Sequence, residues 1–73
     1  MEKLLRQFIF NEAISLNLNE ITDVQGTKWA INVYTLDEQQ RAEKLVSEEY
    51  FAIKDSALTV FQNKYNCLLG VIE

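Results

Sequence analysis

The sequence predicts a small α+β domain in which one or two helices cover one face of an antiparallel sheet. From Lys28 to Tyr34, apolar and polar residues alternate with a period of two, as they do in a half-buried strand. Thr35 and Glu38 follow at the spacing of a capping box, which is typical of the first turn of a helix. The apolar residues between positions 42 and 46 then have helical spacing. A strand that leads directly into a helix is typical of a sheet with helices on one face.

Length and composition point to one folded domain over residues 1–73. The chain is 48% hydrophobic and 25% charged, which is ordinary for a globular protein, and its one Trp, three Tyr and four Phe residues supply core material. A chain of this length buries only roughly 60–65% of its unfolded surface, so we expect a low free energy of unfolding. With no proline and only two glycines, most residues can lie in regular elements.

The first segment, residues 2–13, has two interpretations. A helical stripe is formed by Leu5, Ile9, Ala13 and Leu16 and is widened by Leu4 and Phe8. The run Phe8–Phe10 has strand propensity instead. We take the stripe as the stronger signal and predict a helix over about 2–13, with a strand as the alternative.

A β-hairpin is predicted next, with strands over about 14–22 and 27–35. Apolar and polar residues alternate again from Ile14, and Asp23–Gly26 provides a loop in which Gly26 can adopt a positive φ. The predicted register pairs Thr22 with Thr27, Glu20 with Trp29, Leu18 with Ile31 and Leu16 with Val33. A slip of one residue would bring polar side chains onto the apolar side, so this register is strongly specified.

The capping box opens a predicted helix over about 36–49. On a helical wheel its apolar side consists of Ala42, Leu45, Val46, Tyr50 and Ile53. Asp37 and Arg41 form an i,i+4 pair, which contributes only about 0.2–0.5 kcal/mol. Asp37 and Glu38 also lie in the first turn, where the helix dipole favours anions.

The C-terminal third has two interpretations. In the first, short strands lie at 50–53, 57–61 and 68–72, with turns between them. In the second, Asp55 or Ser56 caps a helix whose apolar stripe consists of Leu58, Phe61, Tyr65, Leu68 and Ile72. The strand propensity of Thr59–Phe61 and the turn-like run Asn63–Asn66 favour the first, so we predict short strands here.

Catalytic and metal-binding residue types are scarce. The chain has no histidine, which removes the usual general base near neutral pH and the commonest metal ligand. Its single cysteine, Cys67, cannot form a zinc site alone, and we expect it to be a small buried hydrophobe. There is no glycine-rich phosphate loop, and the adjacent carboxylates Glu48–Glu49 and Asp37–Glu38 would point about 100° apart on a helix. We therefore expect no enzymatic activity, no metal and no cofactor.

The charge of the chain and its N-terminal residues argue against further classes of protein: nucleic-acid-binding, membrane-bound and secreted proteins. The net charge is −4, and the seven Lys and Arg residues are scattered, which disfavours direct binding to nucleic acid or to an anionic membrane. The apolar run Phe8–Phe10 is too short for the core of a signal peptide or for a membrane span. A lone cysteine suits a reducing compartment, so we expect a soluble cytoplasmic protein.

The acidic residues of the predicted helix have two interpretations. They are Asp37, Glu38, Glu43, Glu48 and Glu49. They could imitate the phosphate backbone of DNA and so occupy a nucleic-acid-binding protein. Arg41 and Lys44 interrupt the acidic stripe, and this favours an ordinary solvated helix face.

The polar face of the hairpin is the candidate binding surface. Its residues Asn17, Asn19, Asn32 and Tyr34, together with Ser15, should point away from the core. Asn is depleted in strands, so three on one face are unexpected, and Tyr is enriched at interfaces. We predict that these three Asn residues and Tyr34 bind a partner; an ordinary wet face of a one-sided sheet is the alternative.

These observations lead to one principal hypothesis and two alternatives. The principal hypothesis is a non-enzymatic protein-binding or regulatory module, an inhibitor or adaptor that acts on a larger protein partner. The alternatives are a structural homo-oligomer, because small domains often complete their burial by association, and an acidic DNA-mimic inhibitor. A short acidic chain rich in Asn, Ile and Phe also suits a protein encoded by a phage or mobile element.

Overall fold

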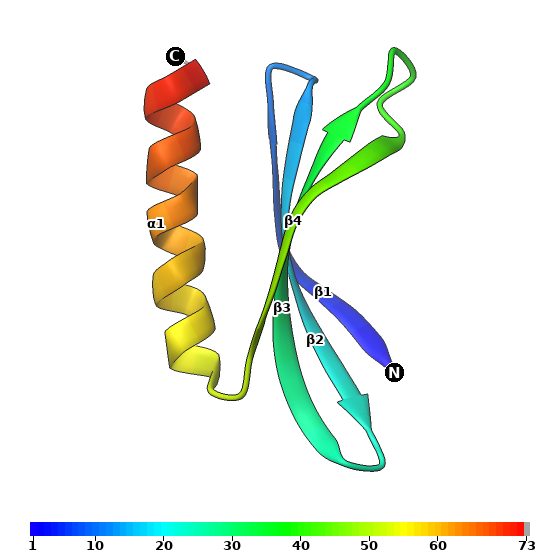
Figure 1. The fold of residues 1–73 in the computed structure, drawn as a ribbon, viewed down its shortest axis with the longest axis vertical. Coiled ribbons are helices and arrows are strands. Elements are labelled where there is room, and N and C mark those ends of the chain that lie inside the picture. Colours follow the sequence, from blue (N-terminus) through cyan, green and yellow to red (C-terminus); the bar gives the residue numbers. More distant parts are fainter. Residues whose placement is uncertain (73) are drawn as a thin grey trace.

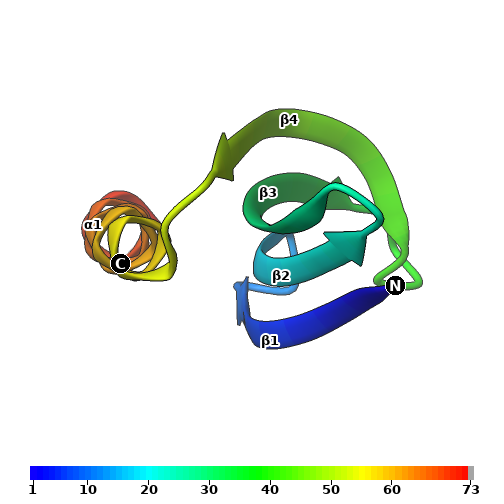
Figure 2. The same ribbon diagram turned by 90° about the horizontal axis from the view of Figure 1, so that it is seen from below.

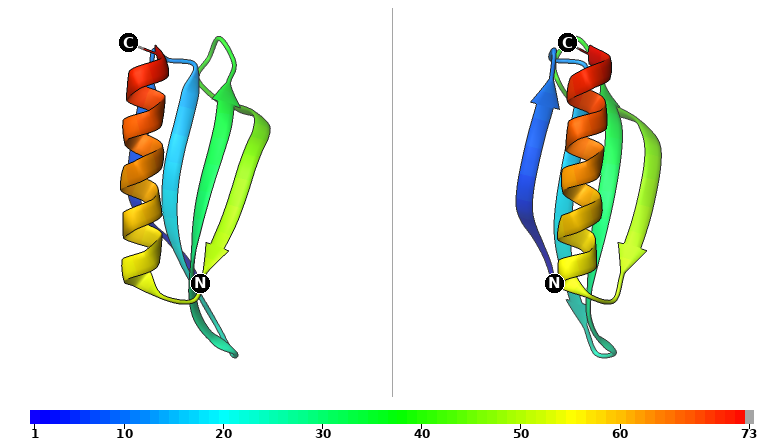
Figure 3. Two further views of the ribbon diagram at one scale, coloured as in Figure 1. Left: turned by 60° about the vertical axis from the view of Figure 1, so that its left-hand side comes forward. Right: turned by 90° about the vertical axis from the view of Figure 1, so that its left-hand side faces the viewer.

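The computed structural model describes residues 1–72 and contains four strands followed by one helix (Figure 1). The elements are β1 (Glu2–Phe10), β2 (Ile14–Asp23), β3 (Gly26–Leu36), β4 (Ala42–Phe51) and α1 (Lys54–Ile72). The strands form one antiparallel sheet in the order β1-β2-β3-β4, and α1 lies along one of its faces (Figure 3). The predicted α+β class is confirmed, although the elements outside the central hairpin differ from the prediction.

β2 and β3 form the predicted hairpin in the predicted register. The paired residues include Thr22–Thr27, Glu20–Trp29, Leu18–Ile31 and Leu16–Val33. The indole Nε1 of Trp29 also donates a hydrogen bond of 3.2 Å to Glu20 Oε2. At the turn, Gly26 has a φ of 125°, a conformation that residues with a Cβ rarely adopt. Local alternation and turn chemistry together determine this part of the fold.

The N-terminal segment is a strand, so the helix predicted over 2–13 is wrong. β1 pairs antiparallel with β2 along the edge opposite β3. Backbone hydrogen bonds to that edge override the helix propensity of the segment. Phe8 and Phe10 turn toward α1, where the Tyr65 ring centroid lies 4.6 and 5.6 Å from theirs. The structure thus follows the strand propensity of Phe8–Phe10.

The segment after β3 is a loop and a strand, so the helix predicted over 36–49 and its capping box are wrong. In the loop, the Asp37 carboxylate accepts hydrogen bonds from the backbone N–H groups of Gln39 and Arg41, at 3.0 and 2.9 Å. The Asp37–Arg41 ion pair expected from the sequence is present at 3.4 Å. It closes this loop, however, and does not stabilise a helical turn.

Pairing with β3 decides the structure of residues 42–51. These residues include three Glu, one Ala, one Lys and one Leu, which favour a helix in isolation. β3 is one of the two central strands, and without β4 it would present a long row of unpaired backbone groups. β4 satisfies this row, and its charged residues are typical of a terminal strand.

Residues 54–72 form α1, so the short strands predicted at 57–61 and 68–72 are wrong, and the one predicted at 50–53 overlaps only the end of β4. The helical alternative is the one observed. Its stripe buries Ala57 and Phe61 and partly buries Leu58, Tyr65 and Leu68. The apolar face of the sheet must be removed from water, and α1 is the segment left to cover it.

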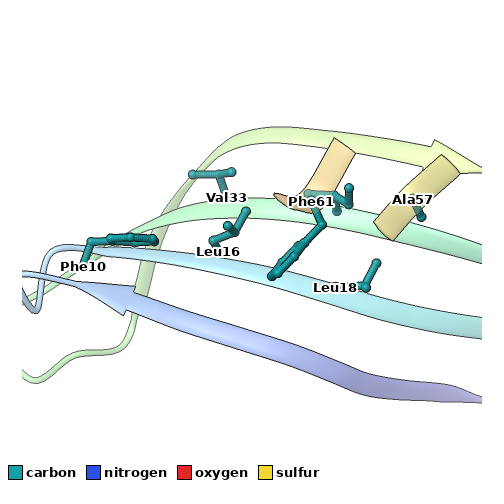
Figure 4. Close-up of a cluster of buried hydrophobic side chains, with 7 residues drawn as sticks. Phe10, Leu16, Leu18, Val33, Ala57 and Phe61 are labelled. Carbon is teal, nitrogen blue, oxygen red and sulfur yellow. The ribbon is translucent and has the colours of Figure 1, made fainter. Parts of the chain in front are cut away.

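The hydrophobic core lies between α1 and the sheet (Figure 4). It consists of Phe10, Leu16, Leu18, Ile31, Val33, Ala57 and Phe61. The hairpin residues of this cluster are the ones predicted to face inward, and Trp29 packs against them. Because side chains alternate along a strand, the other residues of β2 and β3 face the side that α1 leaves uncovered.

Candidate functional site

A row of polar side chains lies on the sheet face opposite α1. The row consists of Ser15, Asn17 and Asn19 on β2 and of Asn32 and Tyr34 on β3. Asn17 is the direct cross-strand partner of Asn32, and Ser15 is the partner of Tyr34. The four predicted binding residues therefore lie together on one face and point away from the core.

The amides of this row are buried, whereas the sequence predicts an open surface. Asn17, Asn19 and Asn32 expose only 6, 8 and 6% of their surface. The sheet is strongly twisted, and β4 arcs over β3 on one side while β1 flanks β2 on the other (Figure 2). The row forms the floor of a pocket that is also lined by residues of β1 and by Ala42 at the start of β4, and we call this pocket the amide cleft.

The amide cleft has the size and lining of a ligand site. Its volume is about 480 Å³, and ligand pockets usually measure about 300–1,000 Å³. Its walls are formed by Glu2, Leu4, Gln7 and Ile9 of β1 and by Leu36, Gln40 and Ala42 on the opposite side. Leu4 and Ile9 are about half exposed. Apolar side chains on both walls lie beside convergent polar groups, as they do in binding sites, and here the polar residues outnumber the apolar ones.

One end of the floor is a closed hydrogen-bond network. Gln7 Nε2 donates to Asn17 Oδ1 at 2.7 Å and to Ser15 Oγ at 3.3 Å. Ser15 Oγ in turn donates to Asn17 Oδ1 at 3.2 Å. The sequence prediction missed Gln7 because it placed this residue on a helix; as part of a strand paired with β2, it lies directly opposite Asn17.

The neighbouring part of the floor contains an unpaired acceptor. Asn32 Nδ2 donates a hydrogen bond of 3.2 Å to the Tyr34 hydroxyl oxygen. Asn32 Oδ1 is buried and has no hydrogen-bond partner among the described residues. An unsatisfied buried acceptor costs about 1–3 kcal/mol. A donor that enters the cleft can therefore bond to this atom once a neighbouring side chain moves to expose it.

Acidic and aromatic side chains of β4 lie on the same face of the sheet as the cleft, beside the residues that line it. Glu48 is the cross-strand partner of Asn32, and it accepts a hydrogen bond of 2.7 Å from the Tyr50 hydroxyl. This hydrogen bond raises the pKa of Tyr50 above its ordinary value, and the charges of Glu48 and Glu2 add to the effect. Lys28 Nζ lies 4.7 Å from the centroid of the Tyr50 ring. The border thus combines negative charge with a cation–π contact.

The five acidic residues between positions 37 and 49 do not share one face. Asp37 and Glu38 lie in the β3–β4 loop. On β4, Glu48 points to the amide cleft, while Glu49 points toward α1 and forms an ion pair of 2.6 Å with Lys64. The acidic helix face expected from the sequence is therefore absent.

Cys67 is exposed on α1, so its predicted burial is wrong. The stripe that faces the sheet runs through Phe61, Tyr65 and Leu68, and Cys67 falls beside it. Within residues 1–72, no three Cys, Asp or Glu side chains gather closely enough to hold a metal ion. In the same part of the chain, no helix has the length and apolarity to cross a membrane.

No family model, no curated protein and no solved structure matches this chain. The features that bear on function are therefore those of the amide cleft itself: its volume, its buried amides and its unpaired acceptor.

Proposed function

We propose that this protein is a small non-enzymatic binding module, an inhibitor or adaptor that holds a segment of a larger protein in the amide cleft. The observation that carries the proposal is Asn32 Oδ1, a buried acceptor without a partner among the described residues, on a residue that lines the cleft. A ligand that donates a hydrogen bond to this atom recovers on binding the free energy that the free protein lacks.

The amide row supports this proposal because its residue types are not those that favour the centre of a sheet. Asn is depleted in strands, and the centre of a small sheet is where apolar packing contributes most. Elsewhere in the hairpin, the register, the apolar face and the turn at Gly26 all agree with the fold. A chain departs from such local consistency chiefly at functional sites. Binding is the simplest reason for three buried Asn side chains on one face.

The shape of the cleft favours an inserted segment over flat docking. A volume of about 480 Å³ accommodates one or two side chains, and Leu4 and Ile9 offer apolar contacts beside the polar floor.

The single cysteine of the chain suits a reducing compartment, so we assign this activity to the cytoplasm.

Selection from a random peptide library displayed on phage tests the proposal. We expect enriched peptides to bind the wild-type protein and to lose binding to Asn32→Leu and Tyr34→Ala. Asn66→Leu is the matched control, because Asn66 is exposed on α1, on the other side of the sheet. Peptides that bind Asn32→Leu as tightly as the wild type would overturn the proposal.

A second candidate function is a homo-oligomer, favoured by the apolar surface beside β4. A groove of about 380 Å³ runs between β4 and α1 and is lined mainly by Val33, Val46, Val60 and Leu68. Val46 is 58% exposed, and β4 is a terminal strand with one edge open to pairing. Light scattering after size exclusion distinguishes the two candidates: a dimer that Val46→Lys dissociates supports the oligomer, and a monomer at micromolar concentration excludes it.

A further inference from the structure

We infer, on the basis of the proposed function, that the amide cleft receives a basic side chain, Arg or Lys, from the partner segment. Three features of the cleft support this choice: its hydrogen-bonding polarity, its charge and its aromatic border.

One atom of the floor, Asn32 Oδ1, requires a donor. It can only accept, and the Asn32 amide nitrogen donates one of its two N–H groups to the Tyr34 hydroxyl. Asn17 Oδ1, beside it, accepts from both Gln7 and Ser15. Arg and Lys carry several hydrogen-bond donors and no acceptor, whereas Asp and Glu in their charged forms carry no donor. An acidic side chain would therefore leave Asn32 Oδ1 unpaired.

The charges around the cleft select a cation among the donors. None of the described residues that line the cleft is Lys or Arg, and Glu2 is among them. Glu48 lies directly opposite Asn32 on the neighbouring strand. Both carboxylates are exposed, so each attracts a cation with the modest strength of a surface charge, and Lys28, which lies over the Tyr50 ring, offsets part of this attraction.

The aromatic border already holds a cation. Lys28 Nζ lies over the ring of Tyr50 at 4.7 Å from its centroid, and Tyr50 in turn donates to Glu48. A second tyrosine, Tyr34, lines the cleft beside Asn32. Phenol rings of this kind stabilise ammonium and guanidinium groups that approach their faces.

Entry of the basic group requires a side-chain adjustment. Asn32 Oδ1 is shielded from solvent in the free protein, so a neighbouring side chain must move to expose it. We expect this to be Tyr34, which is partly buried and accepts a hydrogen bond from the Asn32 amide nitrogen. Rotamer changes of this size commonly accompany binding, whereas the backbone of a paired strand moves little.

NMR titration with blocked tripeptides tests the inference. The probes are acetyl-Gly-Xaa-Gly-amides in which Xaa is Arg, Lys, Gln, Leu or Glu. The readout is the chemical shift of the Asn32 side-chain amide in the intact labelled protein. We expect the Arg or Lys probe to bind about tenfold more tightly than the Gln probe, since hydrogen bonds to charged groups contribute more than neutral ones. Glu48→Gln should weaken the basic probes roughly two- to fivefold, and Asp55→Asn, which removes a carboxylate on α1, should not.

The outcomes separate this inference from the proposed function. If the Gln or Leu probe changes the chemical shift of the Asn32 side-chain amide at an equal or lower concentration than the basic probes, the preference for a basic side chain is wrong. The cleft then remains a binding site. If none of the probes shifts Asn32 and the peptides selected on phage lack a shared Arg or Lys, the basic preference is also wrong. The proposed function fails only if peptide binding is indifferent to Asn32→Leu.

Discussion

The side-chain amide of Gln7 donates a hydrogen bond of 2.7 Å to Asn17 Oδ1 and so joins the terminal strand β1 to the floor of the amide cleft. Asn17 thereby has donors from two residues, since Ser15 Oγ also donates to it. Its cross-strand partner Asn32 keeps an unpaired acceptor. The acceptor of Asn17 is thus satisfied by hydrogen bonds within the protein, and the acceptor of the adjacent Asn32 is left for a ligand.

Replacing Gln7 tests the satisfied part of the row. We expect Gln7→Ala to lower the free energy of unfolding by about 1 kcal/mol, because it removes a hydrogen bond from a buried acceptor. Urea unfolding followed by Trp29 fluorescence measures the change. Gln62→Ala, at an exposed position of α1, is the control and should change stability by less than about 0.5 kcal/mol. Equal effects of the two substitutions would contradict a structural role for Gln7.

Replacing Asn32 tests the open part of the row. Asn32→Leu removes the unsatisfied buried acceptor Oδ1 and also the hydrogen bond that the amide nitrogen donates to Tyr34. The substitution adds apolar burial in their place. We expect the free energy of unfolding to rise by about 1 kcal/mol, while binding to the selected peptides is lost. Such an exchange of activity for stability is typical of functional sites. A clear loss of stability would show that Asn32 is a structural residue.

The β1–β2 turn contains a residue, Glu12, whose backbone strain a substitution can relieve. Asn11 and Glu12 have φ values of 50° and 58°, and the Ala13 N–H donates a hydrogen bond of 2.9 Å to the Phe10 carbonyl. Positive φ at both central positions defines a type I′ turn, in which Asn-Gly is preferred. We expect Glu12→Gly to stabilise the protein by about 1 kcal/mol in thermal melts. Gly26→Ala, at a φ of 125°, should have the opposite effect.

Phe61 is the central side chain between α1 and the sheet. It is fully buried, and its ring lies 6.0 Å from that of Phe8 between centroids. Phe61→Ala should lower the free energy of unfolding by about 3–5 kcal/mol, which leaves a domain this small largely unfolded. Phe61→Leu should cost about 1 kcal/mol and retain the fold. Circular dichroism distinguishes these outcomes, and a folded Phe61→Ala protein would contradict the central position of this ring.

We expect the Tyr50 hydroxyl to lose its proton at a higher pH than an ordinary tyrosine, because it is hydrogen-bonded to Glu48. The hydrogen bond to Glu48 raises the pKa of Tyr50 in the folded protein above the ordinary 10.0. As the pH rises, the unfolded chain releases this proton first, so the contribution to stability is constant below about pH 10 and is lost as the pH passes the folded pKa. NMR of labelled tyrosine measures the titration. Glu48→Gln should lower the pKa of Tyr50 toward 10.0; an unchanged titration would exclude Glu48 as the cause.

The candidate site could be predicted only in part. Asn17, Asn19, Asn32 and Tyr34 share a face because alternation along paired strands is visible in the sequence. Their burial was not predictable, because it depends on β1 and β4, which flank the row from elsewhere in the chain. Gln7 was missed for the same reason, since its role depends on the register of β1 against β2.

The class of the fold and the β2–β3 hairpin with its register follow from local sequence pattern. Both strands and the turn at Gly26 lie within one short segment, and a slip of one residue would reverse its apolar face. In contrast, residues 2–10 and 42–51 are strands and residues 54–72 form the helix because of contacts made between distant segments. The hydrogen-bond partners of β1 and β4, and the apolar face that α1 covers, belong to the hairpin and not to the segments themselves.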